Sequence, residues 1–369
     1  MEENKDDNLG KLIKIAIWLL VLGGIIFTLF LLKEKLPMFK TKKVEVINTA
    51  SNRNDLANRN EDFAKAESLL GEDPSQALES YKKALAQAFS QSDIDSISFR
   101  VALATYRSGN VKESVSLFKN LISSSTVSNI TKAYSVQFLA QEYFSTNDTN
   151  LFNIIFSDDP YKGFFADGNK DNALRKLVEY GKSFQALPIL SLRSADYKAR
   201  DLMNLPPQKQ VEKENLISEI KNDITVADIG IEVLRGSPNI DQLPVIYNRK
   251  LILSTNLKRA GYILGDPTDA YVKGSDYANL YNDRNTLMFL HFNYAIYLSI
   301  ENLAQNSDKI VSTLRNIYEE KDRNLKIFQY LKNKASADPK TDEVAGFIVS
   351  LVSVDNSFKN FLQTLGWKF

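Results

Sequence analysis

A set of residues that recurs at a nearly constant interval constrains the fold of this chain more than any other feature. Small residues recur every 38 residues at Ala64, Ala102 and Ala140, and so do turn residues at Gly71, Gly109 and Asn147. Two further positions recur every 37 residues, at Ala77, Ser114 and Leu151 and at Tyr81, Phe118 and Ile155. A period in this range is typical of stacked helix pairs, in which each pair buries its apolar face against the next.

The clearest unit is "ALATYRSGNVKESVSLFKNLI", residues 102–122. Two segments with helical apolar spacing flank the turn "SGN", which predicts two helices joined by a tight turn. In the preceding unit we expect Asp73 to cap a helix that has Pro74 at its first position.

The segments "EDPSQALESYKKAL" (72–85) and "GNVKESVSLFKNLI" (109–122) resemble the second half of a tetratricopeptide repeat. That pattern has a small residue early in the helix, an aromatic residue four positions later and a closing alanine or leucine. The matching residues are Ala77, Tyr81 and Ala84 in one unit and Ser114, Phe118 and Leu121 in the next. Departures from the pattern are Ser98, where the family has an early tryptophan, and Leu151 and Asp158 in the third unit.

The resemblance covers about residues 58–160. It implies an α-solenoid whose first helices line a concave surface that holds an extended or helical segment of a partner protein. The residues that it assigns to this groove, on helices 95–107 and 130–144, are Arg100, Tyr106, Gln137 and Tyr143.

Residues 15–32, "IAIWLLVLGGIIFTLFLL", carry no charge and predict a membrane anchor. With Leu12 and Ile13 the run nearly matches a hydrocarbon core of about 30 Å at about 1.5 Å per residue. We therefore expect a tail at 1–11, a single transmembrane helix at 12–32 and a linker at 33–58. A cleaved signal peptide is the alternative, but the run is long for one and no small-residue cleavage site follows it.

Two sequence features give opposite indications of the side of the membrane on which the C-terminal domain lies. Lysines are in excess after the span, at Lys33, Lys35, Lys40, Lys42 and Lys43, which favours a cytoplasmic C-terminal domain. Short N-terminal anchors in bacteria commonly export the domain that follows, and the lack of cysteine agrees with export. We prefer the extracytoplasmic side.

Residues 161–369 are expected to be helical as well, either as a degenerate continuation of the solenoid or as a separate bundle that begins near residue 208. The predicted helices are 172–184, 188–203, 209–222, 227–234, 243–264, 280–305, 308–334 and 342–365, with a loop at 265–276. The apolar segment 286–300 is too short for a second span and predicts a buried helix. The C-terminal helix is expected to cover the end of the array; a membrane-surface helix is the alternative.

Composition excludes several classes of site. The chain has 46 basic and 45 acidic residues, no cysteine and one histidine, so a nucleic-acid footprint, a thiolate site and a multi-histidine metal centre are not expected. "DGNKDN" (167–172) has alternate oxygen ligands like a calcium loop, but Asn172 and Val178 replace the required glycine and glutamate. The segment is better interpreted as an Asx turn before a helix. The single histidine, His291, is interpreted as a buried core residue. We predict no cofactor and no metal.

These observations favour an all-α, non-enzymatic scaffold or adaptor at the membrane that binds a protein partner, in the assembly of an envelope or secretion complex. One alternative is an all-helical envelope hydrolase or lyase that uses a pair of carboxylates in the C-terminal half. The other is a structural subunit of an oligomeric membrane complex.

Overall fold

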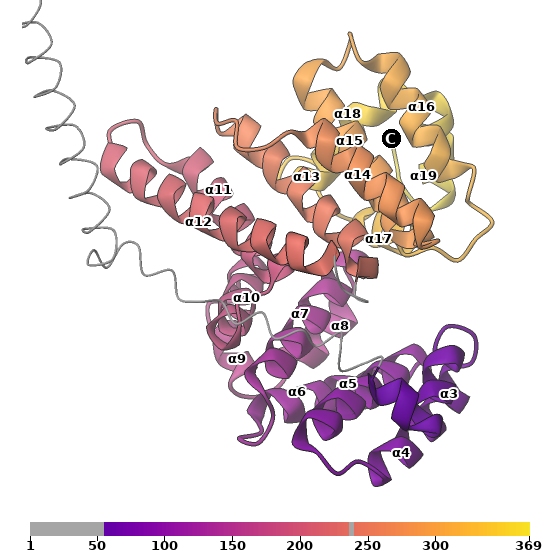
Figure 1. The fold of residues 1–369 in the computed structure, drawn as a ribbon. Helices are drawn as coiled ribbons and strands as arrows, with labels where there is room; N and C mark the ends of the chain where they lie inside the picture. Colours follow the sequence, from indigo (N-terminus) through magenta and orange to yellow (C-terminus); the bar gives the residue numbers. More distant parts are fainter. Residues whose placement is uncertain (1–54, 236–239) are drawn as a thin grey trace, which may run out of the picture. The chain divides into compact units, whose positions relative to one another are not determined.

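A computed structural model describes residues 55–235 and 240–369, and these residues form helices without a strand among them (Figure 1). The predicted tail, the membrane helix 12–32 and all but the last residues of the linker lie outside this range. In the described part, no helix combines the length and apolar character needed to cross a bilayer. Residues 55–59, which include the last four residues of the linker predicted at 33–58, are already helical, and Leu56 is buried.

Eight helices in the first half of the described region pack largely in chain order. They are α3 (Glu61–Leu69), α4 (Pro74–Ala86), α5 (Gln91–Arg107), α6 (Val111–Ser123), α7 (Asn129–Thr146), α8 (Thr149–Ile155), α9 (Tyr161–Phe164) and α10 (Lys170–Phe184). The hairpin predicted at 102–122 is confirmed as α5 and α6, and Gly109 takes the left-handed conformation (φ 91°) in its turn. The Asp73 cap is also confirmed, since its carboxylate accepts a hydrogen bond from Gln76 N at 3.0 Å.

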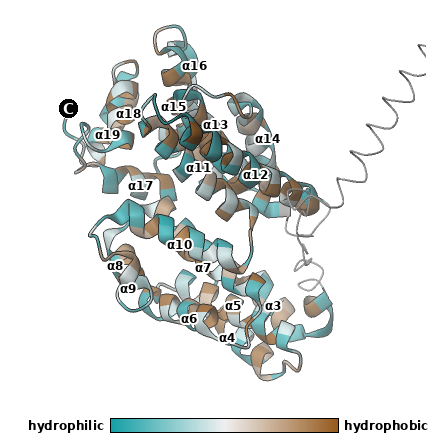
Figure 2. Ribbon diagram, turned by 90° about the vertical axis from the view of Figure 1, so that its left-hand side faces the viewer, coloured by the Kyte–Doolittle hydropathy of each residue, from teal (hydrophilic) through white to brown (hydrophobic). Residues whose placement is uncertain are grey.

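The second half contains α11 (Pro188–Asn204), α12 (Gln210–Arg235), the 3-10 helix η2 (Ile240–Gln242), α13 (Leu243–Arg259), α14 (Pro267–Leu280), α15 (Arg284–Asn302), α16 (Ser307–Tyr318), α17 (Lys326–Lys334), α18 (Glu343–Val352) and α19 (Asn356–Thr364). Most helices carry both hydrophobic and hydrophilic residues along their length, as amphipathic helices do (Figure 2). The segment predicted as a buried helix is α15, in which Leu290, Ala295 and Leu298 are buried.

Two hydrophobic cores meet at α11. Leu187, Leu190 and Tyr197 belong to a core built from residues 56–197, and Leu192 and Ala199 to a core built from residues 189–367. The second core therefore begins near residue 189 rather than near 208. Both cores belong to one compact unit, which contains all of the described residues.

The loop predicted at 265–276 is wrong, because these residues form most of α14. Asp266 caps the helix by accepting from Thr268 N, and Pro267 takes the first position. Gly274, inside this helix, serves helix packing, since a Cβ atom built there would lie 2.8 Å from Leu290 Cδ2 and 3.0 Å from Tyr247 Cβ. A glycine inside a helix lets two neighbours approach the backbone closely.

Other predicted helix boundaries are also wrong. The helices expected at 209–222 and 227–234 are one helix, α12, because Asp223 is buried in ion pairs rather than ending a helix. The helix expected at 308–334 is interrupted at residues 319–325, the first five of which are charged. The helix expected at 342–365 is also two, because Asp355 caps α19 through Ser357 N and Phe358 N.

The C-terminal helices pack into the second core. Phe358 and Leu362 of α19 are fully buried, and Trp367 donates from Nε1 to Leu331 O of α17 at 2.9 Å. These side chains are therefore not available for the membrane-surface alternative. The α17 helix in turn packs on α7: Lys326 Nζ lies 2.8 Å from Glu142 Oε1, and Asn333 Nδ2 donates to Thr146 O at 2.7 Å.

Candidate functional site

A groove of about 310 Å³ is lined by α3, α5 and α7 on one side and by α11, η2 and α13 on the other; we call it the α5–α7 groove. Its lining residues are Phe63, Ser96, Phe99, Arg100, Thr131, Tyr134, Gln137, Phe138, Gln141, Ile189, Asp241, Gln242 and Val245. Two of the four predicted groove residues, Arg100 and Gln137, are therefore in it.

Half-buried aromatic rings form much of the groove wall. Phe99 packs edge-on against Tyr134, with ring centroids 6.5 Å apart, and against the buried Phe118, at 5.4 Å. Phe118 also supports Phe138, at 4.6 Å. Arg100 Nε lies 3.0 Å from Glu67 Oε1, so its guanidinium is held at the rim by an ion pair. The groove thus combines fixed apolar surfaces with amide and hydroxyl groups.

The other two predicted residues lie elsewhere. Tyr106 packs edge-on against Phe138 at 5.2 Å, and burial together with the Glu142 carboxylate raises the pKa of its hydroxyl. Tyr143 lines a second cavity, where its hydroxyl donates to Asn147 Oδ1 at 3.3 Å and burial raises its pKa. The four residues therefore do not form one surface.

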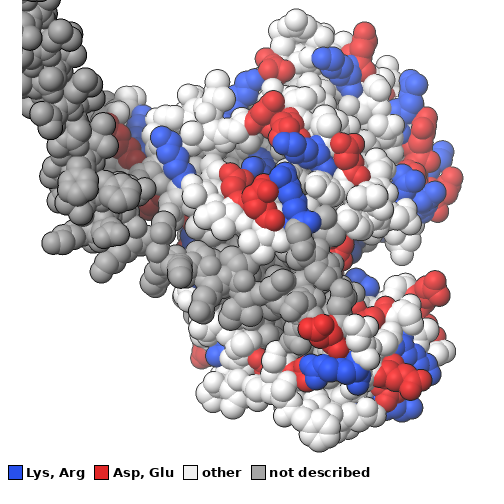
Figure 3. Space-filling model, viewed as in Figure 1, with Lys and Arg blue, Asp and Glu red and all other residues white. Residues whose placement is uncertain are grey.

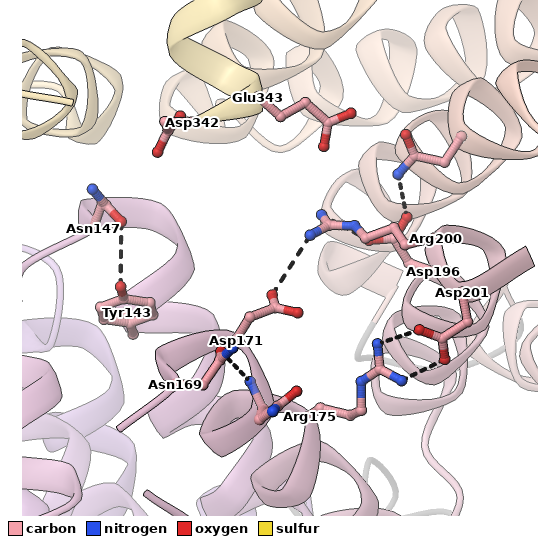
Figure 4. A network of polar contacts seen from close by, with 12 residues as sticks. Tyr143, Asn147, Asn169, Asp171, Arg175, Asp196, Arg200, Asp201, Asp342 and Glu343 are labelled. Carbon is pink, nitrogen blue, oxygen red and sulfur yellow. Dashed lines mark hydrogen bonds and ion pairs between the residues drawn. The ribbon is translucent and has the colours of Figure 1, made fainter. Parts of the chain in front are cut away.

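The second cavity, about 470 Å³, was not predicted from the sequence; we call it the arginine cavity. Residues of α7, α10, α11 and α18 surround it, with Tyr143 and Asn147 facing Arg200 and Glu343 across the space (Figure 4). The α13, α15 and α17 helices complete its walls. The charged residues that line it are Lys170, Arg193, Arg200, Arg249 and Lys334, and Asp171, Asp196, Asp342 and Glu343.

Part of this charge is paired within the cavity. Arg200 lies 3.3 Å from Asp196 and 3.6 Å from Asp171, and Asn256 Nδ2 donates to Asp196 Oδ1 at 2.6 Å. Lys334 pairs with Asp342 at 2.6 Å. Glu343 pairs with Arg259, just outside the lining.

The positive charges of Arg193 and Arg249 are balanced less well by nearby carboxylates. Burial, with repulsion from Arg249, holds the pKa of Arg193 well below its usual range. Burial also lowers the pKa of Arg249, although the Asp196 carboxylate opposes the shift. The Arg193 guanidinium stacks 3.3 Å from the centroid of Phe144 and donates to Gln141 Oε1 at 3.1 Å, so this residue contacts the walls of both cavities.

The sequence does contain a pattern that belongs to the arginine cavity, but this pattern normally indicates a solvent-exposed helix face. Arg193, Asp196, Tyr197 and Arg200 lie at positions i, i+3, i+4 and i+7 of α11 and so share one helix face. A charged stripe of this kind normally faces water. Here it is covered by α13, α15 and α17, which come from distant parts of the sequence.

The remaining sequence motifs have structural roles. Asn169 caps α10 by accepting from Asn172 N at 3.1 Å, so "DGNKDN" forms the expected Asx turn. His291 is buried and its Nδ1 lies 3.0 Å from the hydroxyl of Tyr271. Burial lowers the pKa of His291 to about 4. Within the described ranges, no group of histidine, aspartate and glutamate side chains is arranged to hold a metal ion.

Carboxylates do line a cavity in the C-terminal half, as the alternative enzyme would require. Both Asp171 and Asp196, however, contact the same guanidinium, that of Arg200. On the molecular face shown in Figure 3, basic and acidic side chains are interspersed.

No protein-family model, no curated protein and no solved structure matches this chain.

Proposed function

We propose that this chain is a membrane-anchored, non-catalytic scaffold that holds a segment of a partner protein in the α5–α7 groove. The observation that carries the proposal is the groove itself, since one of its walls comes from α3, α5 and α7, the first helices of successive helix pairs. We further propose that residues 59–160 are a tetratricopeptide-like array. Its support is the full burial of Ala77 and Ser114, which occupy the small-residue position of successive units.

The chemistry of the groove suits a peptide segment. Phe99, Tyr134 and Phe138 offer rigid apolar faces for the side chains of a ligand. Gln137 and Thr131 offer donors and acceptors for the backbone of an extended chain. Aromatic anchors surrounded by polar groups are the usual source of binding energy at protein interfaces. We place this activity in the assembly of an envelope or secretion complex.

A photocrosslinking residue at Gln137 of the full chain is expected to capture the partner in cells, because Gln137 lines the groove. The same residue placed at the exposed Gln363 of α19 is the matched control and is expected to capture no common product. With the captured segment as a synthetic peptide, Tyr134→Ala should weaken binding about tenfold, as loss of an interface aromatic does. Equal crosslinking from both positions, or unchanged affinity of the Tyr134→Ala protein, would contradict the proposal.

We also propose that residues 12–32 anchor the chain with its helical domain on the extracytoplasmic side. The support is the uncharged run of 18 residues at 15–32. Protease added to intact cells is expected to digest the helical domain, while a cytoplasmic marker protein stays intact. A helical domain that resists protease until the cells are permeabilised would place it in the cytoplasm, as the lysine excess after the span suggests.

A further inference from the structure

We propose that the arginine cavity is a second binding site, which takes a small organic monocarboxylate with an aromatic or apolar body. This site is separate from the α5–α7 groove and does not depend on the peptide-binding proposal. The inference rests on its uncompensated cations, its unpartnered donors and the aromatic residues of its walls.

The first observation is positive charge without an ion-pair partner among the described residues. Arg193 is only 4% exposed, and its Nε has no hydrogen-bond partner among the described residues. Arg249 Nε is likewise buried and unpartnered there, and the two guanidinium groups repel each other. The ion pairs of the cavity belong to Arg200 and Lys334 instead. Buried cations of this kind are costly to a fold unless an anion accompanies them.

The second observation is a neutral donor beside these cations. Tyr197, on the same face of α11, is 4% exposed, and its hydroxyl has no hydrogen-bond partner among the described residues. A buried hydroxyl without a partner is unfavourable, so a ligand oxygen here is stabilised. A carboxylate offers two oxygens and accepts from guanidinium and hydroxyl donors together.

The third observation concerns the size and sign of the ligand. Five cationic and four anionic side chains line the cavity, and Glu343 is paired with Arg259 outside the lining, so the site has an excess of positive charge that the carboxylate of a ligand would reduce. Phe289, Phe292 and Phe347 supply apolar walls. The volume of about 470 Å³ lies within the range of small-molecule sites. A monocarboxylate on an aromatic body matches both the charge and the walls.

The test uses the full-length protein and calorimetric titration with 3-phenylpropionate as the probe. We expect saturable binding at one site, and binding at least about tenfold weaker for the neutral analogue 3-phenylpropanol, which lacks the charge. Arg249→Gln is expected to weaken binding of 3-phenylpropionate by at least about tenfold, because it removes a charged donor. Arg315→Gln, which removes the same charge from an exposed position on α16, should bind like the original protein.

Arg249→Lys keeps the charge and should retain binding within a few-fold, so it serves if the glutamine variant fails to fold. The proposal is overturned if 3-phenylpropionate does not bind, or if it binds no better than 3-phenylpropanol. Unchanged binding by Arg249→Gln overturns it as well. Tighter binding of phenyl phosphate or of inorganic phosphate would overturn the assignment of a monocarboxylate.

Discussion

Replacing the buried Asp223 with alanine is expected to lower the free energy of unfolding by about 3–5 kcal/mol, because it leaves two half-buried lysines without their anion. The Asp223 carboxylate lies on α12 and is 3% exposed. Its Oδ1 accepts from Lys182 Nζ of α10 at 2.8 Å, and its Oδ2 from Lys198 Nζ of α11 at 2.8 Å. The hydroxyl of Ser194 donates to Oδ2 at 3.0 Å. One side chain therefore joins three helices.

The negative charge of Asp223 also affects the pKa of Lys198. Burial acts to lower the pKa of Lys198, but the hydrogen bonds and negative charges of Asp223 and Glu219 together outweigh it, and the pKa is raised. The measurement is urea unfolding of a fragment of residues 48–369, which contains both hydrophobic cores. The matched control is Asp269→Ala, which breaks an exposed pair with Lys273 and should cost less than about 1 kcal/mol. Equal losses in the two variants would show that the buried cluster contributes nothing special to stability.

Replacing Phe118 with alanine is expected to cost about 3–5 kcal/mol of unfolding free energy, since it empties a fully buried aromatic position. Phe118, on α6, supports Phe99 of α5 and Phe138 of α7 from behind the groove wall. Loss of the Phe118 ring should therefore lower stability, as measured by urea unfolding. It should also weaken binding of the synthetic partner peptide in the α5–α7 groove, as measured by titration.

Phe89→Ala is the control for this substitution, because the Phe89 side chain is 99% exposed. It should change the unfolding free energy by less than about 0.5 kcal/mol, as surface substitutions usually do. A loss below about 1 kcal/mol for Phe118→Ala would mean that the ring is not packed as described.

The parts of the fold that could be predicted depend on local signals. The hairpin at 102–122 follows from apolar spacing around a glycine turn, and the burial of α15 follows from its apolar sequence. The errors arise where tertiary packing changes the meaning of a residue. The loop predicted at 265–276 is mostly α14, where Gly274 allows close packing. The break predicted between 222 and 227 lies inside α12, where Asp223 belongs to a buried ion cluster.

Of the two candidate sites, one could be predicted in part from local sequence and the other depends on tertiary packing. Arg100 and Gln137 could be assigned to the groove because they lie on the first helices of adjacent pairs. The arginine cavity could not be predicted, because the stripe that contains Arg193 and Arg200 looks like a solvated helix face. Only its distant covering helices, such as α17, turn it into a cavity.

The contact between α17 and α7 has a consequence for how the chain folds. An open stack of helix pairs frays from its ends, because each unit contacts only its neighbours. Here Lys326 binds Glu142 across 184 positions of sequence, and Asn333 binds Thr146 across 187. The two cores are thereby coupled, so their unfolding becomes more nearly all-or-none. During synthesis, α7 must also wait for nearly the whole chain to leave the ribosome before its last partners arrive.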